Sequence, residues 1–86
     1  MIIARIIDNV WATRKADQLS GLKFMLAEEI RGDSSKNRLI AVDVIGAGIG
    51  DRVIISTGSS AREMIGRSVP VDAIVVGIID EDCKLK

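Results

Sequence analysis

The hydrophobic residues of this chain fall in short β-branched runs, separated by polar or glycine-containing segments. Such runs are typical of β-strands, because Val, Ile and Thr pack well on a pleated surface. The pattern predicts strands at residues 2–7 (leading to Val10 and Trp11), 39–45, 52–57 and 71–80. The last run is almost continuously apolar, which indicates a strand buried on both faces, by the domain core or by a partner.

The segments between these runs carry turn signals. Residues 14–21 are mostly polar and are predicted to be a loop, and residues 32–37 form a cluster of turn-forming types. Residues 59–66 predict a short helix near positions 60–65. There Ser60 and Glu63 have the spacing of a capping box, and Gly66 can end the helix.

Residues 22–31 are ambiguous between helix and strand. Leu22, Met25, Leu26 and Ile30 fall at helical spacing, whereas Leu22, Phe24 and Leu26 alternate as in a strand. Lys, Met, Leu, Ala and Glu are good helix formers, so the local sequence favours a helix by a small margin.

The composition indicates one small, aliphatic domain spanning residues 1–86. The chain has 86 residues, of which 48% are hydrophobic, with one Trp, one Phe and no Tyr. A chain of this length buries only about 60–65% of its unfolded surface. Part of the aliphatic surface is therefore expected to be covered by neighbouring subunits.

The charge balance and the cysteine content limit which partners and which cellular compartment the sequence predicts. Lys+Arg and Asp+Glu balance at 12 each, without the basic excess of a nucleic-acid binder. Cys83 is the only cysteine, so no internal disulfide forms; it is either a reactive thiol or a small residue in a mobile tail. Arg5 and Asp8 interrupt the first apolar stretch, and no run approaches a membrane span. We expect a soluble, cytoplasmic protein.

Candidate catalytic and metal-binding groups are few. The chain lacks His, the commonest general base, and one cysteine excludes a Cys-rich zinc site. Ser60 has no histidine to activate it, so helix capping is its expected role. The acidic run of residues 80–82 is either a divalent-cation site or a solvated tail. Trp11 either stacks on a ligand or is buried in the core or an interface. We expect no enzyme activity.

The segment from Gly46 to Asp51 resembles the beginning of a flavin or NAD site. The Gly-x-Gly-x-x-Gly fingerprint needs a third glycine that opens a helix, but that position is Asp51 and a strand-like run follows. A carboxylate there would also repel a pyrophosphate. We therefore expect no bound cofactor, and the glycines should serve a turn with unusual backbone angles.

Several motifs together resemble the bacterial microcompartment vertex protein family (EutN/CcmL-like). They are Trp-Ala-Thr-Arg-Lys at 11–15, Leu-Ser-Gly-Leu-Lys at 19–23, the segment 41–51, Gly-Ser-Ser-Ala-Arg at 58–62 and the segment 70–80. The ordered set runs from Met1 to about Asp80. One departure is Asp51, where the family usually has Glu. The loop of residues 32–38 is short compared with many carboxysome members, which favours a catabolic compartment.

The resemblance implies a mainly β fold, a small five-stranded OB-like barrel with one short helix near residues 60–65, assembled as a homopentamer. Residues 22–31 would then form a strand, against the local helical spacing. The implied function is structural: capping the vertices of a polyhedral shell alongside hexameric shell proteins. An oligonucleotide-binding OB module is the alternative, and a nucleotide-binding enzyme would need a helix after Gly50.

Two sets of site residues follow from a ring. We expect the glycine-rich loop to lie at the ring axis, although a plain turn remote from the axis is the alternative. The expected axis residues are Gly46, Ala47, Gly48, Ile49 and Gly50. Their amides can hold a small anion or water, as nests do. The expected subunit-interface residues, which are otherwise solvated surface, are Arg14, Lys15, Ser59, Ser60 and Arg62.

Overall fold

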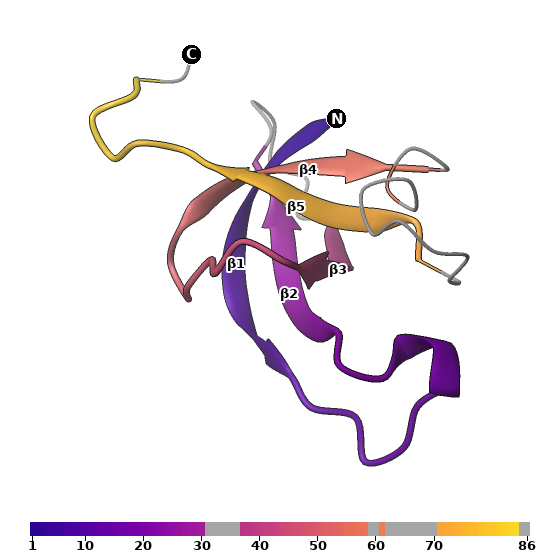
Figure 1. Ribbon diagram of the computed structural model, residues 1–86. Helices are drawn as coiled ribbons and strands as arrows, with labels where there is room; N and C mark the ends of the chain where they lie inside the picture. The colour runs from indigo at the N-terminus through magenta and orange to yellow at the C-terminus, as the bar shows by residue number, and fades with distance from the viewer. Residues whose placement is uncertain (31–36, 59–60, 62–70, 85–86) are drawn as a thin grey trace.

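The chain forms a closed five-stranded β-barrel in a computed structural model that describes residues 1–30, 37–58, 61 and 71–84. The strands are β1 (Ile2–Val10), β2 (Lys23–Glu29), β3 (Arg38–Asp43), β4 (Arg52–Thr57) and β5 (Ala73–Ile78). They are ordered β1-β2-β3-β5-β4 around the barrel, as Figure 1 shows. A short 3₁₀ helix, η1 (Asp17–Leu19), lies in the connection between β1 and β2.

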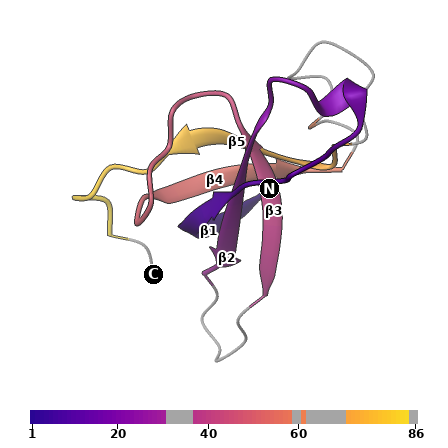
Figure 2. The ribbon, with the colours of Figure 1, turned by 90° about the horizontal axis from the view of Figure 1, so that it is seen from below.

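Neighbouring strands pair antiparallel, except β3 and β5, which run parallel. The long strand β1 pairs with β2 on one side and β4 on the other, and so closes the barrel (Figure 2). The register of β1 against β2 shifts between Ile6 and Asp8, and that of β4 against β5 shifts between Ile54 and Ile55. Such bulges bend strands and increase their twist, which a small closed barrel requires.

The barrel interior is filled by alternating side chains from all five strands. Its buried members are Ala4, Ile6, Met25, Ala27, Ala41, Ala47, Val53, Ile55, Ala73 and Val75. Half of these residues are alanines, and their small side chains suit the narrow interior of a barrel with so few strands. The interior is therefore packed and offers no ligand cavity among the described residues.

A second buried cluster lies on the outer face of the barrel. It consists of Val42, Ala61, Val71 and Ile74, with Leu19, Leu22, Phe24 and Val76 packed against it. On β5, Ala73 and Val75 face the barrel interior while Ile74 enters this outer cluster. The apolar run predicted to be buried on both faces is so at Ala73, Ile74 and Val75, where the same chain covers both faces, whereas Ile78 is 47% exposed.

The predicted fold class is confirmed, whereas the local preference for helix at residues 22–31 is wrong. These residues contain β2, which pairs along its length with both β1 and β3. Met25 and Ala27 point into the barrel, and Phe24 and Leu26 point outward. Cross-strand pairing and burial outweigh a helix preference of a few tenths of a kcal/mol per residue.

Strand boundaries otherwise differ from prediction by a few residues. Strand β1 continues to Val10, β3 ends at Asp43 instead of residue 45, and β5 ends at Ile78. The predicted loop 14–21 contains η1. The helix predicted near residues 60–65 lies outside the described residues apart from Ala61. Among the described residues, no helix has the length and apolar character needed to cross a membrane.

Candidate functional site

The glycine-rich loop connects β3 to β4 and lies across one end of the barrel. Gly46 and Gly50 adopt positive φ angles of 87° and 90°, which only glycine adopts without strain. The Ala47 side chain between them is 2% exposed and belongs to the barrel core. The Ala47 side chain thus closes the barrel end, and the placement of this loop at a ring axis stays a prediction. Ile49 instead points outward and is 61% exposed.

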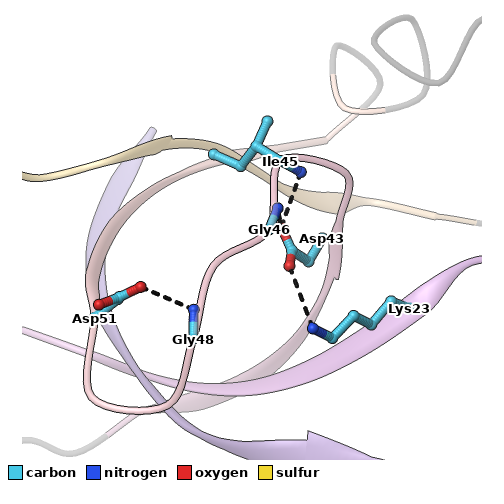
Figure 3. Close-up of polar contacts among 6 residues, drawn as sticks. All are labelled: Lys23, Asp43, Ile45, Gly46, Gly48 and Asp51. Carbon is cyan, nitrogen blue, oxygen red and sulfur yellow. Dashed lines mark hydrogen bonds and ion pairs between the residues drawn. The ribbon is translucent and has the colours of Figure 1, made fainter.

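Two carboxylates bind the amides of this loop, as Figure 3 shows. Asp43 Oδ1 accepts hydrogen bonds from the backbone N–H of Ile45, at 3.0 Å, and of Gly46, at 3.1 Å. Asp51 Oδ2 accepts one from the N–H of Gly48, at 2.8 Å. An Asp that bonds the amide two residues on forms an Asx turn, which explains why β3 ends at Asp43.

These contacts occupy amides that were expected to hold an anion. The N–H groups of Ile45, Gly46 and Gly48 already have carboxylate partners from the same chain. The Gly50 N–H donates to the Ile6 carbonyl at 2.9 Å. A phosphate would have to displace Asp43 or Asp51 from these donors, so the same geometry argues against a dinucleotide at this loop.

Asp43 is the most buried charged group at this end of the barrel. Its side chain is 0% exposed, and the Lys23 ammonium lies 3.9 Å from Oδ2. Oδ2 itself has no hydrogen-bond partner in the structure. Because an unpaired buried oxygen is costly, the nearby Lys23 charge is what offsets its desolvation. The pair fixes the start of the loop against β2.

The far side of the loop is fastened to β1. The Arg5 guanidinium donates to the Gly50 carbonyl at 2.8 Å, and the Ile6 N–H donates to the Asp51 carbonyl at 2.9 Å. Both ends of the loop are thus held by neighbouring strands. The loop presents Val44, Ile45 and Ile49 to its surroundings, with exposures of 49%, 43% and 61%.

The expected interface residues divide into three groups. Arg14 is exposed and lies in the connection between β1 and β2. Lys15 makes contacts within its own chain: its ammonium donates to the Leu22 carbonyl at 3.0 Å and lies 4.8 Å from the centre of the Phe24 ring. Ser59, Ser60 and Arg62 lie outside the described residues. Arg14 and Lys15 thus belong to the β1–β2 connection, and these contacts of Lys15 are not with the loop of residues 44–51.

Trp11 is 86% exposed at the end of β1, so the interpretation of a ring buried in its own core is wrong. It borders a recess of about 290 Å³ that also includes Lys15, Lys23 and Phe24. The opposite end of the barrel has a larger, mainly apolar recess of about 660 Å³. Sequence reasoning missed that second recess, because strands far apart in the chain build it.

The chain after β5 is held by Arg52. Its Nη2 atom donates to the carbonyls of Asp80, at 2.8 Å, Glu81, at 3.3 Å, and Cys83, at 2.8 Å. These hydrogen bonds connect residues 80–83 to β4. Cys83 is exposed, and the described residues contain no cluster of three or more His, Cys, Asp or Glu side chains that would suit a metal ion.

Comparison with known proteins places this geometry in a family. The family described as "Ethanolamine utilisation protein EutN/carboxysome" matches residues 1–80. The carboxysome shell vertex protein CcmL of Thermosynechococcus vestitus is 41% identical, over 93% of this chain and 84% of that protein. The bacterial microcompartment shell vertex protein GrpN of Rhodospirillum rubrum is 42% identical, over 93% of each chain. A solved structure titled as that pentameric GrpN shell protein superposes with a TM-score of 0.81 at 36% identity, covering 99% of this chain and 100% of that one.

Proposed function

This chain belongs to the ethanolamine utilisation protein EutN/carboxysome family, and from that premise we propose that it is a shell vertex protein. In this proposal five copies form a ring that caps each corner of a polyhedral bacterial microcompartment. The observation that carries it is the match to vertex proteins along nearly the whole chain, with a pentameric relative among the similar structures. Its localisation would be the shell of such a compartment.

The surface of the barrel supports assembly. Met1, Trp11, Ile40 and Ile49 are each more than half exposed. Val44, Ile45 and Ile49 lie together on one loop, and an exposed apolar patch of this kind marks a contact site with other chains. A ring needs two different patches on each subunit, joined head to tail with a rotation that closes.

Native mass spectrometry tests the ring directly. We expect a complex of five subunits that persists at micromolar concentration. Co-assembly with hexameric shell proteins then tests the vertex role, because sixfold tiles alone form sheets or tubes and fivefold units supply the curvature. Closed particles should form only when this chain is added. A persistent monomer, or closure that does not depend on this chain, would contradict the proposal.

We further propose a catabolic compartment instead of a carboxysome. The segment of residues 32–38 is short compared with the same loop of many carboxysome members, which supports this proposal. The test is a competition between two sets of hexameric shell proteins. This chain should close shells made from catabolic hexamers in preference to those made from carboxysome hexamers. The reverse preference would refute this assignment and leave the vertex role intact.

The homologues are structural shell proteins, and we infer that this chain likewise catalyses no reaction and binds no cofactor. The carboxylates of Asp43 and Asp51 are engaged with loop amides, which supports this inference. NAD or FAD should leave the thermal midpoint unchanged. A true site would stabilise the fold by about 2.7 kcal/mol at a hundred times its dissociation constant.

We also propose that the loop of residues 44–51 faces the fivefold axis. The amides of Ile45, Gly46 and Gly48 bond to carboxylates of the same chain, and the side chains of Val44, Ile45 and Ile49 are exposed. Replacing Ile49 with Glu would then bring five carboxylates together. Such a ring should dissociate at low ionic strength and recover at high salt, where charges are screened. Salt-independent assembly of this variant would place the loop away from the axis.

Residues Arg14, Lys15, Ser59, Ser60 and Arg62 remain proposed subunit contacts. Arg14 supports this proposal best, because it is exposed and its guanidinium can make several hydrogen bonds at once. Arg14→Ala and Arg62→Ala should shift the mass distribution toward smaller species at low concentration. Unchanged distributions would make both side chains part of the solvated surface.

A further inference from the structure

An exposed aromatic ring and an apolar recess lie at opposite ends of β1. Trp11 follows the strand's last residue and is 86% exposed. The apolar recess surrounds the strand's first residues. Figure 1 shows the β1–β2 connection at one end of the molecule, with the N-terminus and residues 79–84 toward the other. Nine extended residues span about 30 Å, so the two features of one chain do not meet.

The recess has the size and lining that would accommodate an aromatic ring. Its volume is about 660 Å³, and its apolar lining includes Met1, Ile2, Ile3, Ile30, Ile54 and Ile79. Met1 is 85% exposed and Ile30 is 40% exposed, so part of the apolar lining of the recess is in contact with solvent in the single chain. A mainly apolar recess with a few polar lining residues, here Glu29 and Asp80, is typical of a protein contact surface.

The walls of the recess are fixed before any partner binds. The Ile30 N–H donates to the Ile3 carbonyl at 2.9 Å, and the Ile79 N–H donates to the Arg52 carbonyl at 2.8 Å. Arg52 also holds the carbonyls of Asp80 and Cys83, both of which line the recess. A preformed pocket lowers the ordering cost of binding.

We propose that the recess of each subunit receives Trp11 of the next subunit in the ring. The proposal rests on the proposed homopentamer and names one of its contacts. It supplies the two different, complementary patches that a head-to-tail ring requires. A second copy of the chain is the favoured occupant, because Trp11 cannot reach the recess of its own chain. A relative that matches this chain along its whole length is also pentameric. Trp in a desolvated pocket is a frequent hot spot of protein interfaces.

The fluorescence of Trp11 is the first measurement, because the chain has one Trp. In the wild-type pentamer, emission should be blue-shifted and protected from acrylamide. Dilution to monomers should shift it toward the emission of free tryptophan. A pentamer whose Trp11 emission stays red-shifted and fully quenchable would overturn the proposal while the proposed function stands. A monomer at every concentration would instead refute the proposed function first.

The single cysteine locates the contact. Cys83 lines the recess, and a bimane attached to it is quenched by a tryptophan in contact. Labelled wild-type protein should be quenched in the pentamer and bright as the monomer. Labelled Trp11→Phe protein is the matched control and should be bright in both. Equal brightness of the two labelled pentamers would place Trp11 elsewhere.

Substitutions measure the contribution of the contact to assembly. Trp11→Ala should weaken each subunit contact roughly 30-fold, as expected for an interface hot spot. Ile30→Ser, in the recess, should act in the same direction. Ile78→Ser is the control, because Ile78 is also an exposed aliphatic residue, at 47%, and lies outside the recess. If Trp11 becomes shielded only when hexameric shell protein is added, the partner is the hexamer and the contact between copies is ruled out.

Discussion

The connections between β1 and β2 and between β3 and β4 use their residues in opposite ways. In the loop of residues 44–51, carboxylates and strand carbonyls of the same chain bind the amides, and Ala47 fills the barrel core. In the connection of residues 11–22, Trp11 is left 86% exposed. The segment with the most motif-like sequence therefore closes the barrel. The connection of residues 11–22, which includes the predicted polar loop 14–21, begins with the exposed Trp11.

The comparison shows that a glycine-rich sequence does not by itself mark a binding site, because these glycines serve the geometry of a turn. Glycines at Gly46 and Gly50 allow the chain to turn tightly enough for Asp43 and Asp51 to reach neighbouring amides. The β1–β2 connection also has a glycine at positive φ, Gly21, but no carboxylate is bonded to it in the structure. Substitutions in the two connections should therefore have different consequences.

The largest expected effect is that of Asp43→Ala. Two loop amides lose their acceptor, so the free energy of unfolding should fall by about 2–3 kcal/mol. Asp43→Asn keeps an acceptor oxygen at the same place and should lose only about half as much. Urea denaturation at a fixed protein concentration measures both, because assembly also contributes to stability. Equal losses in the two variants would show that the charge near Lys23, and not the amide contacts, matters.

Ala47→Leu should be next in size. The side chain is 2% exposed in the barrel interior, so the added methyl groups should cost about 1–3 kcal/mol through overpacking. Ile49→Leu, two residues away and 61% exposed, is the matched control and should change stability by less than about 0.5 kcal/mol. Thermal unfolding of the two variants checks this. If Ala47→Leu is as stable as the control, the loop does not close the barrel.

Gly46→Ala and Gly21→Ala compare the backbones of the two connections. Both glycines have positive φ, 87° and 81°, and neither has an atom within 4 Å of an added Cβ. Each change should therefore cost about 1 kcal/mol through backbone strain alone. Chemical denaturation should give similar values at the two sites. A much larger loss at Gly46 would mean that the carboxylate contacts amplify the strain.

Lys15→Ala should give the smallest effect. It removes the hydrogen bond to the Leu22 carbonyl and the contact with the Phe24 ring, together worth about 0.5–1 kcal/mol at an exposed site. Lys15→Arg keeps the charge and serves as the control. Trp11 fluorescence is the readout, because loss of this contact should change the emission of Trp11. The connection of residues 11–22 should loosen while the barrel stays folded. An unfolded Lys15→Ala protein would contradict this local role.

The sequence alone supported much of the fold. Strand β4 was predicted with its observed ends, and β1, β3 and β5 within a few residues, because β-branched runs favour a pleated backbone. Residues 22–31 needed the family resemblance, since Met25 and Leu26 fit a helix as well as a strand. The candidate site was less predictable: no local signal shows that Ala47 points inward, that Arg52 holds the chain at Asp80, or that Trp11 is exposed.

The sequence by itself determined the aliphatic strand runs, the lack of histidine and the ordered motifs of the family, because these depend only on residue type and spacing. The tertiary structure decided which face of β2 is buried, which acceptors satisfy the loop amides and where apolar surface remains. Each of those outcomes depends on residues brought together from distant parts of the chain. Pairing and burial across β1, β2 and β3 contribute more free energy than the local preferences of any one segment.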